Sequence, residues 1–157
     1  MITATQAITE LLESAGVEFE PLAHRHTETA AEEANALGVD PHEVAKTIIL
    51  MTDHGFVRAV IPATERLDVR KVRELLDVHH HPHLVHEDEL AEVYPEFELG
   101  AVPPVGGHAG DRVLIDRRLT DHDTIVIEAG THDESLRVKT TELLILTHAS
   151  IGNLCHN

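Results

Sequence analysis

Two segments near the N-terminus have the pattern of amphipathic helices. Apolar residues at positions 4, 7, 8, 11, 12 and 15 recur at the spacing of one helix face. Thr3 and Thr29 each precede a Gln or Glu by three residues, which is the spacing of a capping box. Gly16 and Gly38 follow the two segments and are suited to end them. We expect two helices, joined by a short strand over residues 17–22.

The middle of the chain has the pattern of a β-hairpin. Residues 44–51 (VAKTIILM) form an almost continuous apolar run, which is typical of a strand covered on both faces. Asp53-His54-Gly55 is a turn signal, and residues 56–62 return as a second apolar segment.

The remaining segments mix helix and strand without a regular βαβ alternation. We expect a helix over 67–78, a turn or short strand leading into a helix over 79–95, irregular Gly- and Pro-rich chain over 96–111, strands over 112–119, 123–130 and 135–139, and a closing helix over 140–149. This order predicts an α/β protein with a mixed sheet surrounded by helices, folded as a single domain over residues 1–157.

The composition indicates a globular chain with an aliphatic core. Of 157 residues 42% are apolar, yet there are only three Phe, one Tyr and no Trp. No apolar run approaches the roughly 18 residues of a membrane helix, and the N-terminal segment has no basic region typical of a signal peptide. The single Cys155 cannot form an internal disulfide, so we expect a cytoplasmic protein without a membrane partner.

The formal net charge of −16 weighs against strong non-specific binding to phosphate backbones. Adaptation to a high-salt cytosol and simple solubility both explain an acidic chain with only three lysines. A nucleic-acid partner would need a local basic patch, although ordinary solvated faces explain the same residues equally well. Two sets are candidates: Arg66, Arg70, Lys71 and Arg73, and Arg112, Arg117 and Arg118.

Lys46 is the first candidate for chemistry, because it lies in the apolar run VAKTIIL. Strand residues alternate faces, so Lys46 shares its face with Val44, Ile48 and Leu50. Burial of an unpaired ammonium costs several kcal/mol. The residue therefore either faces a partner or a polar cavity, or lies at the edge of the strand and reaches water; the sequence favours neither.

The loop over residues 100–107 (GAVPPVGG) is the second candidate. Glycines allow a close approach of the backbone to a ligand, and N–H groups in such a loop can stabilise an oxyanion. Composition alone favours a structural turn.

Other chemistry has weaker support. Five histidines between residues 79 and 86 could bind a metal adventitiously, but there is no HExxH or CxxC motif. There is also no GxSxG, GxGxxG or GxxxxGK[ST] motif. We expect neither a metal nor a cofactor.

The segments, taken in order, resemble the YbaK/ProX/aminoacyl-tRNA-synthetase-associated domain family over nearly the whole chain. The segments that carry the resemblance are AGVEFE, EEANALGV, VAKTIIL, AVIP, GAVPPVG, VLIDRRL, TIVIEAG and TTELLILTHA. The resemblance implies a mixed, partly barrel-like sheet surrounded by helices. It also implies hydrolysis of the ester that joins a wrong amino acid to the 3′ adenosine of tRNA.

The resemblance places the family's catalytic lysine on Lys46 and its carbonyl-binding loop on the backbone of Gly100 and Ala101. It implies substrate contacts at Thr47, which follows the lysine, and at the remaining loop positions. The implied substrate-binding set is Phe19, Thr47, Pro103, Gly106, Glu128 and Ser135.

Three positions of that set affect the expected specificity. Glu128 stands where the family often has a serine, Ser135 where an aspartate is common, and Phe19 lacks a hydroxyl that the family sometimes carries. We therefore expect a deacylase acting on Cys-tRNA(Pro), Ala-tRNA(Pro) or a related mischarged tRNA, as a monomer or homodimer, with a synthetase as a further partner. The alternative is a non-catalytic tRNA- or synthetase-binding paralogue.

Overall fold

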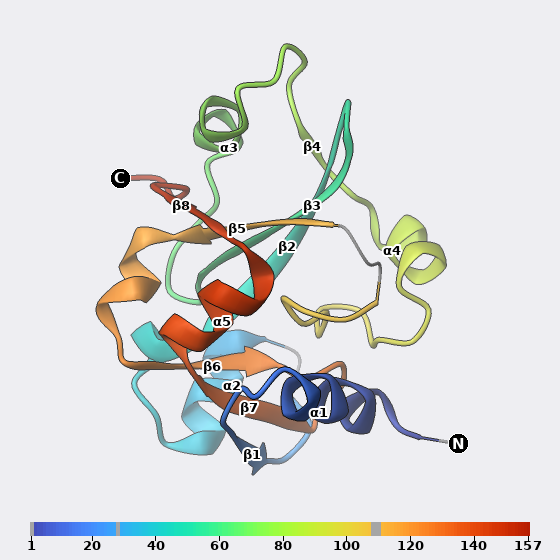
Figure 1. The fold of residues 1–157 in the computed structure, drawn as a ribbon, viewed down its shortest axis with the longest axis vertical. Coiled ribbons are helices and arrows are strands. Elements are labelled where there is room, and N and C mark those ends of the chain that lie inside the picture. The colour runs from blue at the N-terminus through green and yellow to red at the C-terminus, as the bar shows by residue number, and fades with distance from the viewer. Residues whose placement is uncertain (1, 28, 108–110) are drawn as a thin grey trace.

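The mixed α/β class is confirmed by a computed structural model that describes residues 2–27, 29–107 and 111–157 (Figure 1). The helices are α1 (Ala4–Ser14), α2 (Ala30–Leu37), α3 (Val69–Leu76), α4 (Glu87–Val93) and α5 (Thr140–Thr147). The strands are β1 (Phe19–Ala23), β2 (Ala45–Thr52), β3 (Gly55–Pro62), β4 (His83–Leu84), β5 (Arg112–Asp116), β6 (Thr124–Glu128), β7 (Glu134–Lys139) and β8 (Ser150–Gly152).

The strands of the described residues form two sheets, where the sequence suggested one partly barrel-like sheet. The smaller sheet has the order β1-β7-β6 and is antiparallel. The larger has the order β4-β2-β3-β5-β8, in which β2 pairs antiparallel with its two neighbours and β5 pairs parallel with its two. Neither sheet closes into a barrel. In Figure 1 the smaller sheet lies below the larger one, and α5 lies in front of both.

The two sheets meet at a single bridge between Val44 and Val126, which pair in parallel just before β2 and within β6. Both valines are fully buried and pack with Ala34 of α2. No other ladder of the described strands joins the sheets, so β2 and β6 separate beyond this point.

The two N-terminal helices, α1 and α2, begin and end where capping boxes and glycines in the sequence predicted. Thr3 and Gln6 make both bonds of the capping box, at 3.1 and 2.8 Å. Gly16 and Gly38 have φ of 73° and 68°, a left-handed conformation that glycine adopts readily. The β2–β3 hairpin is also confirmed.

The prediction of a strand over residues 112–119 was too long. The strand ends at Asp116, whose carboxylate accepts from the N–H of Arg118 at 2.9 Å and starts a 3₁₀ turn over Arg117–Asp121. The other carboxylate oxygen accepts from Leu154 N–H at 2.8 Å and holds the C-terminal segment. Strand β8, which follows α5 in that segment, was not predicted.

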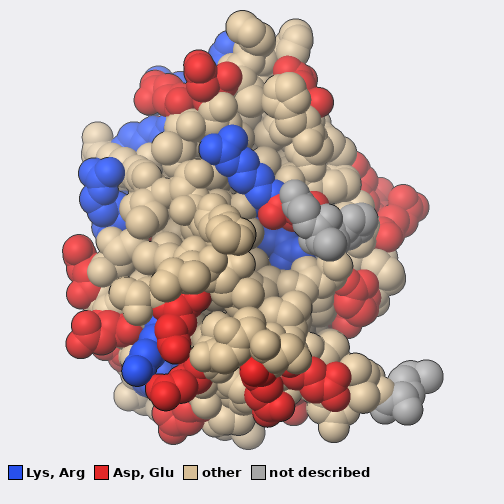
Figure 2. Space-filling view, viewed as in Figure 1, with Lys and Arg blue, Asp and Glu red and all other residues tan. Residues whose placement is uncertain are grey.

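The basic residues do not form a continuous surface on the face shown in Figure 2. Acidic side chains gather along the lower edge and the right flank there, and basic side chains stand in separate places. Several are paired locally: Arg70 lies 3.6 Å from Asp68, and Arg118 lies 3.8 Å from Glu65. These pairs favour the interpretation of both predicted basic sets as ordinary solvated surface.

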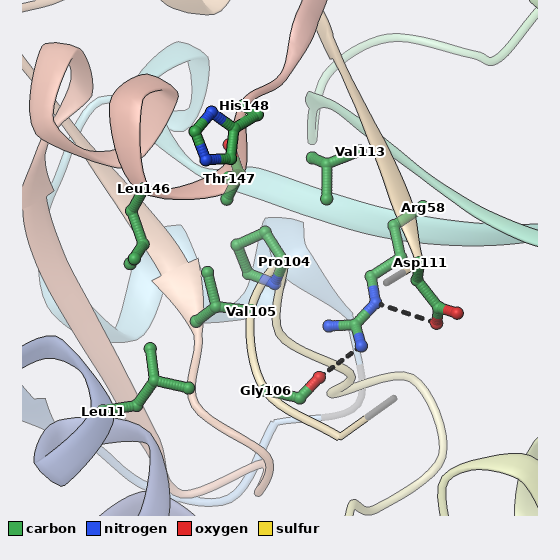
Figure 3. A pocket seen from close by; sticks show the side chains of 10 residues that line it. All are labelled: Leu11, Arg58, Pro104, Val105, Gly106, Asp111, Val113, Leu146, Thr147 and His148. Carbon is green, nitrogen blue, oxygen red and sulfur yellow. Dashed lines mark hydrogen bonds and ion pairs between the residues drawn. The ribbon is translucent and has the colours of Figure 1, made fainter. Parts of the chain in front are cut away.

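A buried arginine fastens the Gly- and Pro-rich loop to the larger sheet (Figure 3). Arg58 of β3 is 2% exposed and donates to the carbonyls of Pro103, at 2.9 Å, and Gly106. Its Nε lies 3.6 Å from Asp111, and its guanidinium lies 4.9 Å from the centre of the Tyr94 ring. The charge is thus compensated by a carboxylate, two carbonyl dipoles and an aromatic face.

Replacement of Arg58 by methionine should destabilise the fold strongly, because Asp111 and two carbonyls would lose their buried partner. We expect the free energy of unfolding to fall by about 3–5 kcal/mol, measured by urea denaturation. Arg70→Met is the matched control, since the Arg70 side chain is 79% exposed and such a pair contributes about 1 kcal/mol or less. Equal losses in the two variants would contradict this assignment.

Candidate active site

A cavity of about 340 Å³ opens where β2 and β6 separate. Of the residues predicted from sequence, the structure brings together Lys46, Thr47, Gly100 and Glu128 around it. The lining is completed by Thr29, Ala31, Ile48 and Ala63. A lysine, a carboxyl, two hydroxyls and a glycine loop thus face one space.

The cavity lies along an open edge of β2. The short strand β4 pairs with β2 only at Leu50 and Met51, and the carbonyl of Ile49 accepts from Val85 N–H on that side at 3.1 Å. Backbone groups of alternate strand residues point the same way, so the N–H and C=O of Thr47 also face this open edge. The edge therefore offers a backbone donor beside the Lys46 side chain.

A second, more apolar cavity of about 210 Å³ adjoins the first along the same edge. The two share Thr47, Ile48 and Gly100. The second is otherwise lined by Ile49, Leu84, Val85, Leu90 and Val102. The site as a whole therefore has a polar end at Lys46 and an apolar end beside Leu84 of β4.

Lys46 lines the polar cavity, one of the two positions that the sequence left open for it. The residue is half-buried and makes no hydrogen bond or ion pair with any described residue. An ammonium in such a position is available to an anion or a polarised carbonyl.

Glu128 is the acidic counterpart of Lys46 in the same cavity. It is 7% exposed, and within the described part of the chain its carboxyl has no hydrogen-bond partner. Val44 and Val126 pair in parallel, so Lys46 and Glu128 each stand two residues beyond the bridge. Burial, followed by repulsion from Glu33, raises the pKa of Glu128 well above its ordinary value.

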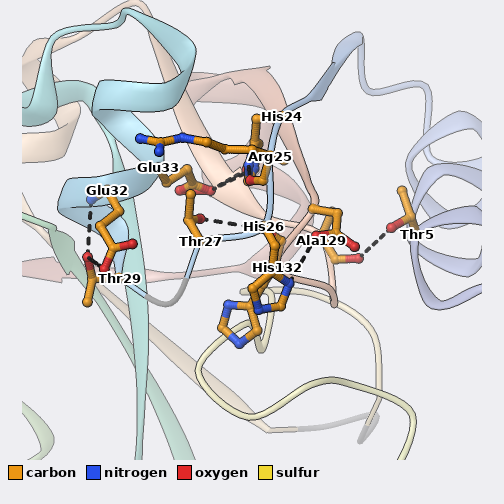
Figure 4. A network of polar contacts seen from close by, with 12 residues as sticks. Thr5, His24, Arg25, His26, Thr27, Thr29, Glu32, Glu33, Ala129 and His132 are labelled. Atoms are coloured by element: carbon orange, nitrogen blue, oxygen red, sulfur yellow. Dashed lines mark hydrogen bonds and ion pairs between the residues drawn. The ribbon is translucent and has the colours of Figure 1, made fainter.

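Glu33 of α2 lies behind Glu128 in a buried polar network, part of which Figure 4 shows. The hydroxyl of Ser135 donates to Glu33, and Nε2 of His24 lies 3.0 Å from the same hydroxyl. Burial raises the pKa of Glu33, and the Ser135 bond and the nearby His24 oppose that shift. Ser135, predicted as a substrate contact, therefore supports Glu33.

The Gly100 loop is held against the turn between β6 and β7. Gly130 N–H donates to the carbonyl of Ala101 at 3.0 Å, and the N–H of Ala101 donates to the carbonyl of Glu98 at 3.0 Å. Gly100 has φ of 81°, and a Cβ there would lie 3.3 Å from the ring of His132. A glycine is thus required for the turn, while the Ala101 N–H is engaged within the loop.

The other predicted contacts lie away from this cavity. Phe19 pairs with Val138 in the smaller sheet and packs on the main core. Pro103 and Gly106 present their carbonyls to Arg58. Thr29 and Ala63 line the cavity although the sequence did not single them out. Ala63 directly follows β3, and its N–H donates to the carbonyl of Val44 at 2.7 Å, so the hairpin places it beside β2. Thr29 lies outside the hairpin and reaches the cavity only through the tertiary fold.

Thiol and metal chemistry receive no support from the described residues. Cys155 is fully buried, and burial together with a hydrogen bond to Asp116 raises its pKa to about 12, so the thiol stays protonated. Within residues 2–27, 29–107 and 111–157, no group of three or more His, Cys, Asp or Glu side chains could hold a metal ion. No helix in the same residues is long and apolar enough to cross a membrane.

Comparison with known families identifies the class of protein to which the chain belongs. The sequence profile of the aminoacyl-tRNA editing domain family matches residues 24–146, and the chain belongs to this family. No curated protein matches the chain.

Solved structures of the same fold cover the whole domain. A candidate trans-editing enzyme for prolyl-tRNA synthetase superposes with a TM-score of 0.86 at 24% identity, over 100% of this chain and 99% of that one. A hypothetical protein gives a TM-score of 0.86 at 26% identity, over 95% of this chain and 99% of that one. A protein from a study of computational epitope grafting onto scaffolds gives 0.85 at 23%, over 100% and 99%.

The raised pKa of Glu128 predicts a pH-dependent stability. In the interval between its ordinary and its raised pKa, the folded state holds a proton that the unfolded chain releases. The bound proton stabilises the folded state most at acid pH, and this contribution to the free energy of unfolding declines as the pH rises through that interval. Glu128→Gln lacks this decline, so the free energy of unfolding of the variant relative to that of the wild type should increase as the pH rises above the ordinary pKa of a glutamic acid.

Urea denaturation at several pH values measures this difference. Glu10→Gln, on the exposed side of α1, is the control and should give a difference that does not change with pH. A constant difference for Glu128→Gln would show that this carboxyl titrates alike in both states.

Proposed function

We propose that the protein is a trans-acting deacylase that hydrolyses the ester of mischarged tRNA. The observation that carries the proposal is the cavity at the open edge of β2, where an unpaired Lys46 ammonium adjoins the Gly100 loop in a chain of the editing family. The cavity suits the aminoacyl end of a tRNA.

The chemistry asks little of the protein, because an aminoacyl ester is already labile. A bound water attacks the carbonyl carbon, the carbonyl oxygen gains negative charge, and the adenosine hydroxyl leaves with a proton. In this proposal Lys46 and the Thr47 N–H stabilise that oxygen, and the Gly100 loop positions the ester. A hydroxyl of the substrate next to the ester is suited to orient the water.

The specific substrates we propose are Ala-tRNA(Pro) and Cys-tRNA(Pro). The fold neighbour described as a candidate trans-editing enzyme for prolyl-tRNA synthetase supports this choice. A synthetase partner and a cytoplasmic setting are parts of the same proposal.

A non-catalytic paralogue that binds tRNA or a synthetase is the second candidate. It is favoured by the Ala101 N–H, which is bonded to Glu98 rather than directed at a substrate, and by the net charge of −16. Such a protein would bind mischarged tRNA without releasing its amino acid.

Lys46→Ala should lower kcat/KM for Ala-tRNA(Pro) about 100- to 1000-fold, which is the usual loss when a group that stabilises an oxyanion is removed. Release of labelled alanine from preformed Ala-tRNA(Pro) measures the rate. Lys139→Ala is the control, because Lys139 is exposed and pairs only with Glu18 among the described residues, at 3.3 Å.

A panel of Ala-tRNA(Pro), Cys-tRNA(Pro) and correctly charged Pro-tRNA(Pro) separates the two candidates. We expect the wild type to hydrolyse the first two and spare the third. A wild-type rate for Lys46→Ala would exclude the proposed mechanism. Binding without hydrolysis of any substrate would favour the paralogue.

A further inference from the structure

The lining of the polar cavity includes a lysine and a glutamate that are not paired with each other. Lys46 and Glu128 both line it, yet no ion pair joins them and neither bonds to another described residue. Each stands two residues beyond the Val44–Val126 bridge, on strands that run in the same direction. The fold thus places an ammonium and a carboxyl in the lining of one cavity.

The carboxyl of Glu128 cannot be explained as part of the buried network behind it. Glu33 already accepts from Ser135, and Ser135 also contacts His24. One carboxyl oxygen of Glu33 is buried without a hydrogen-bond partner. Glu33 therefore repels the charged form of Glu128 and does not donate a hydrogen bond to it. Among the described residues, Glu33 of α2 repels the charged form of Glu128 and His24 lies close to Glu33, while Lys46 of β2 lines the same cavity as Glu128. A buried acid in this setting lacks a cation.

An α-aminoacyl ester has the matching arrangement of groups. Its carbonyl oxygen, which becomes negative during hydrolysis, is separated from a positive ammonium by only two carbon atoms, the carbonyl carbon and Cα. Resting on the proposed deacylase function, we propose that Glu128 binds the α-ammonium of the aminoacyl group while Lys46 faces the ester carbonyl. Glu128 is thereby a specificity residue for free α-amino esters.

This role differs from two others that a buried glutamate beside a lysine could have. If Glu128 only adjusted the charge of Lys46, its loss would slow every ester alike. If Glu128 only supported the fold, its replacement would also slow the hydrolysis of every ester by the same factor, whatever the acyl group. Binding of the α-ammonium makes the loss depend on that group alone.

The experiment compares two substrates that differ only in this group. Alanyl-tRNA(Pro) carries the α-ammonium, and lactyl-tRNA(Pro), made from it by deamination with nitrous acid, carries a hydroxyl in its place. We measure kcat/KM of the wild type and of Glu128→Gln on both. The ratio of wild type to variant for each substrate cancels the different intrinsic reactivity of the two esters.

We expect Glu128→Gln to slow alanyl-tRNA(Pro) about 10- to 100-fold more than lactyl-tRNA(Pro), the range of a hydrogen bond to a charged group. Glu33→Gln is the matched control, because it removes a buried carboxyl that is not part of the cavity lining. That variant should keep the wild-type preference. Thermal unfolding verifies that both variants are folded.

Each outcome has a distinct meaning. Equal slowing of both substrates by Glu128→Gln, or no slowing of either, would overturn the α-ammonium assignment while the deacylase function stands. Loss of the preference in Glu33→Gln as well would also overturn it. If Glu128→Gln does not fold, the wild type alone tests the α-ammonium assignment. Equal efficiency on lactyl-tRNA(Pro) and alanyl-tRNA(Pro), after correction for the uncatalysed rates, would overturn the assignment. If the wild type hydrolyses neither ester, the proposed function itself fails, and the assignment with it.

Discussion

The contact between Val44 and Val126 is the constraint on which the site depends. It joins the two sheets at one buried point, and the strands on either side then follow different partners, β2 with β3 and β6 with β7. A continuous ladder here would have placed paired backbone where the cavity now lies. Because pairing stops after one bridge, the next residues of the same face, Lys46 and Glu128, line a space instead of packing on each other.

The second requirement is a loop that reaches this space without regular structure of its own. The loop is held at one end by the Arg58 guanidinium and at the other by the bond between Gly130 and Ala101. Fixing both ends leaves Gly100 in the left-handed conformation beside His132. The rigidity that a binding site needs is thus supplied from the larger sheet and from the turn after β6, rather than by the loop residues.

The sequence predicted the parts of this molecule that local interactions determine. Capping boxes, glycine stops and the hairpin turn act over a few residues, so α1, α2 and the β2–β3 hairpin were evident. Lys46 and the Gly100 loop were candidates from the residues themselves, Glu128 was named through the family resemblance, and the structure brings the three into one cavity. The division into two sheets and the tether from Arg58 could not be predicted, because both depend on pairings between distant segments that leave no periodic pattern.

The lining of the polar cavity comes from four separate parts of the chain, near residues 29–31, 46–48, 100 and 128. The segments that carry them reach their places only when the hairpin, the Gly- and Pro-rich loop and the smaller sheet have all assembled. Such long-range assembly costs loop-closure entropy before any contact of the site forms. We therefore expect the binding site to form late in folding, and a fragment that lacks one of these four segments lacks part of the lining.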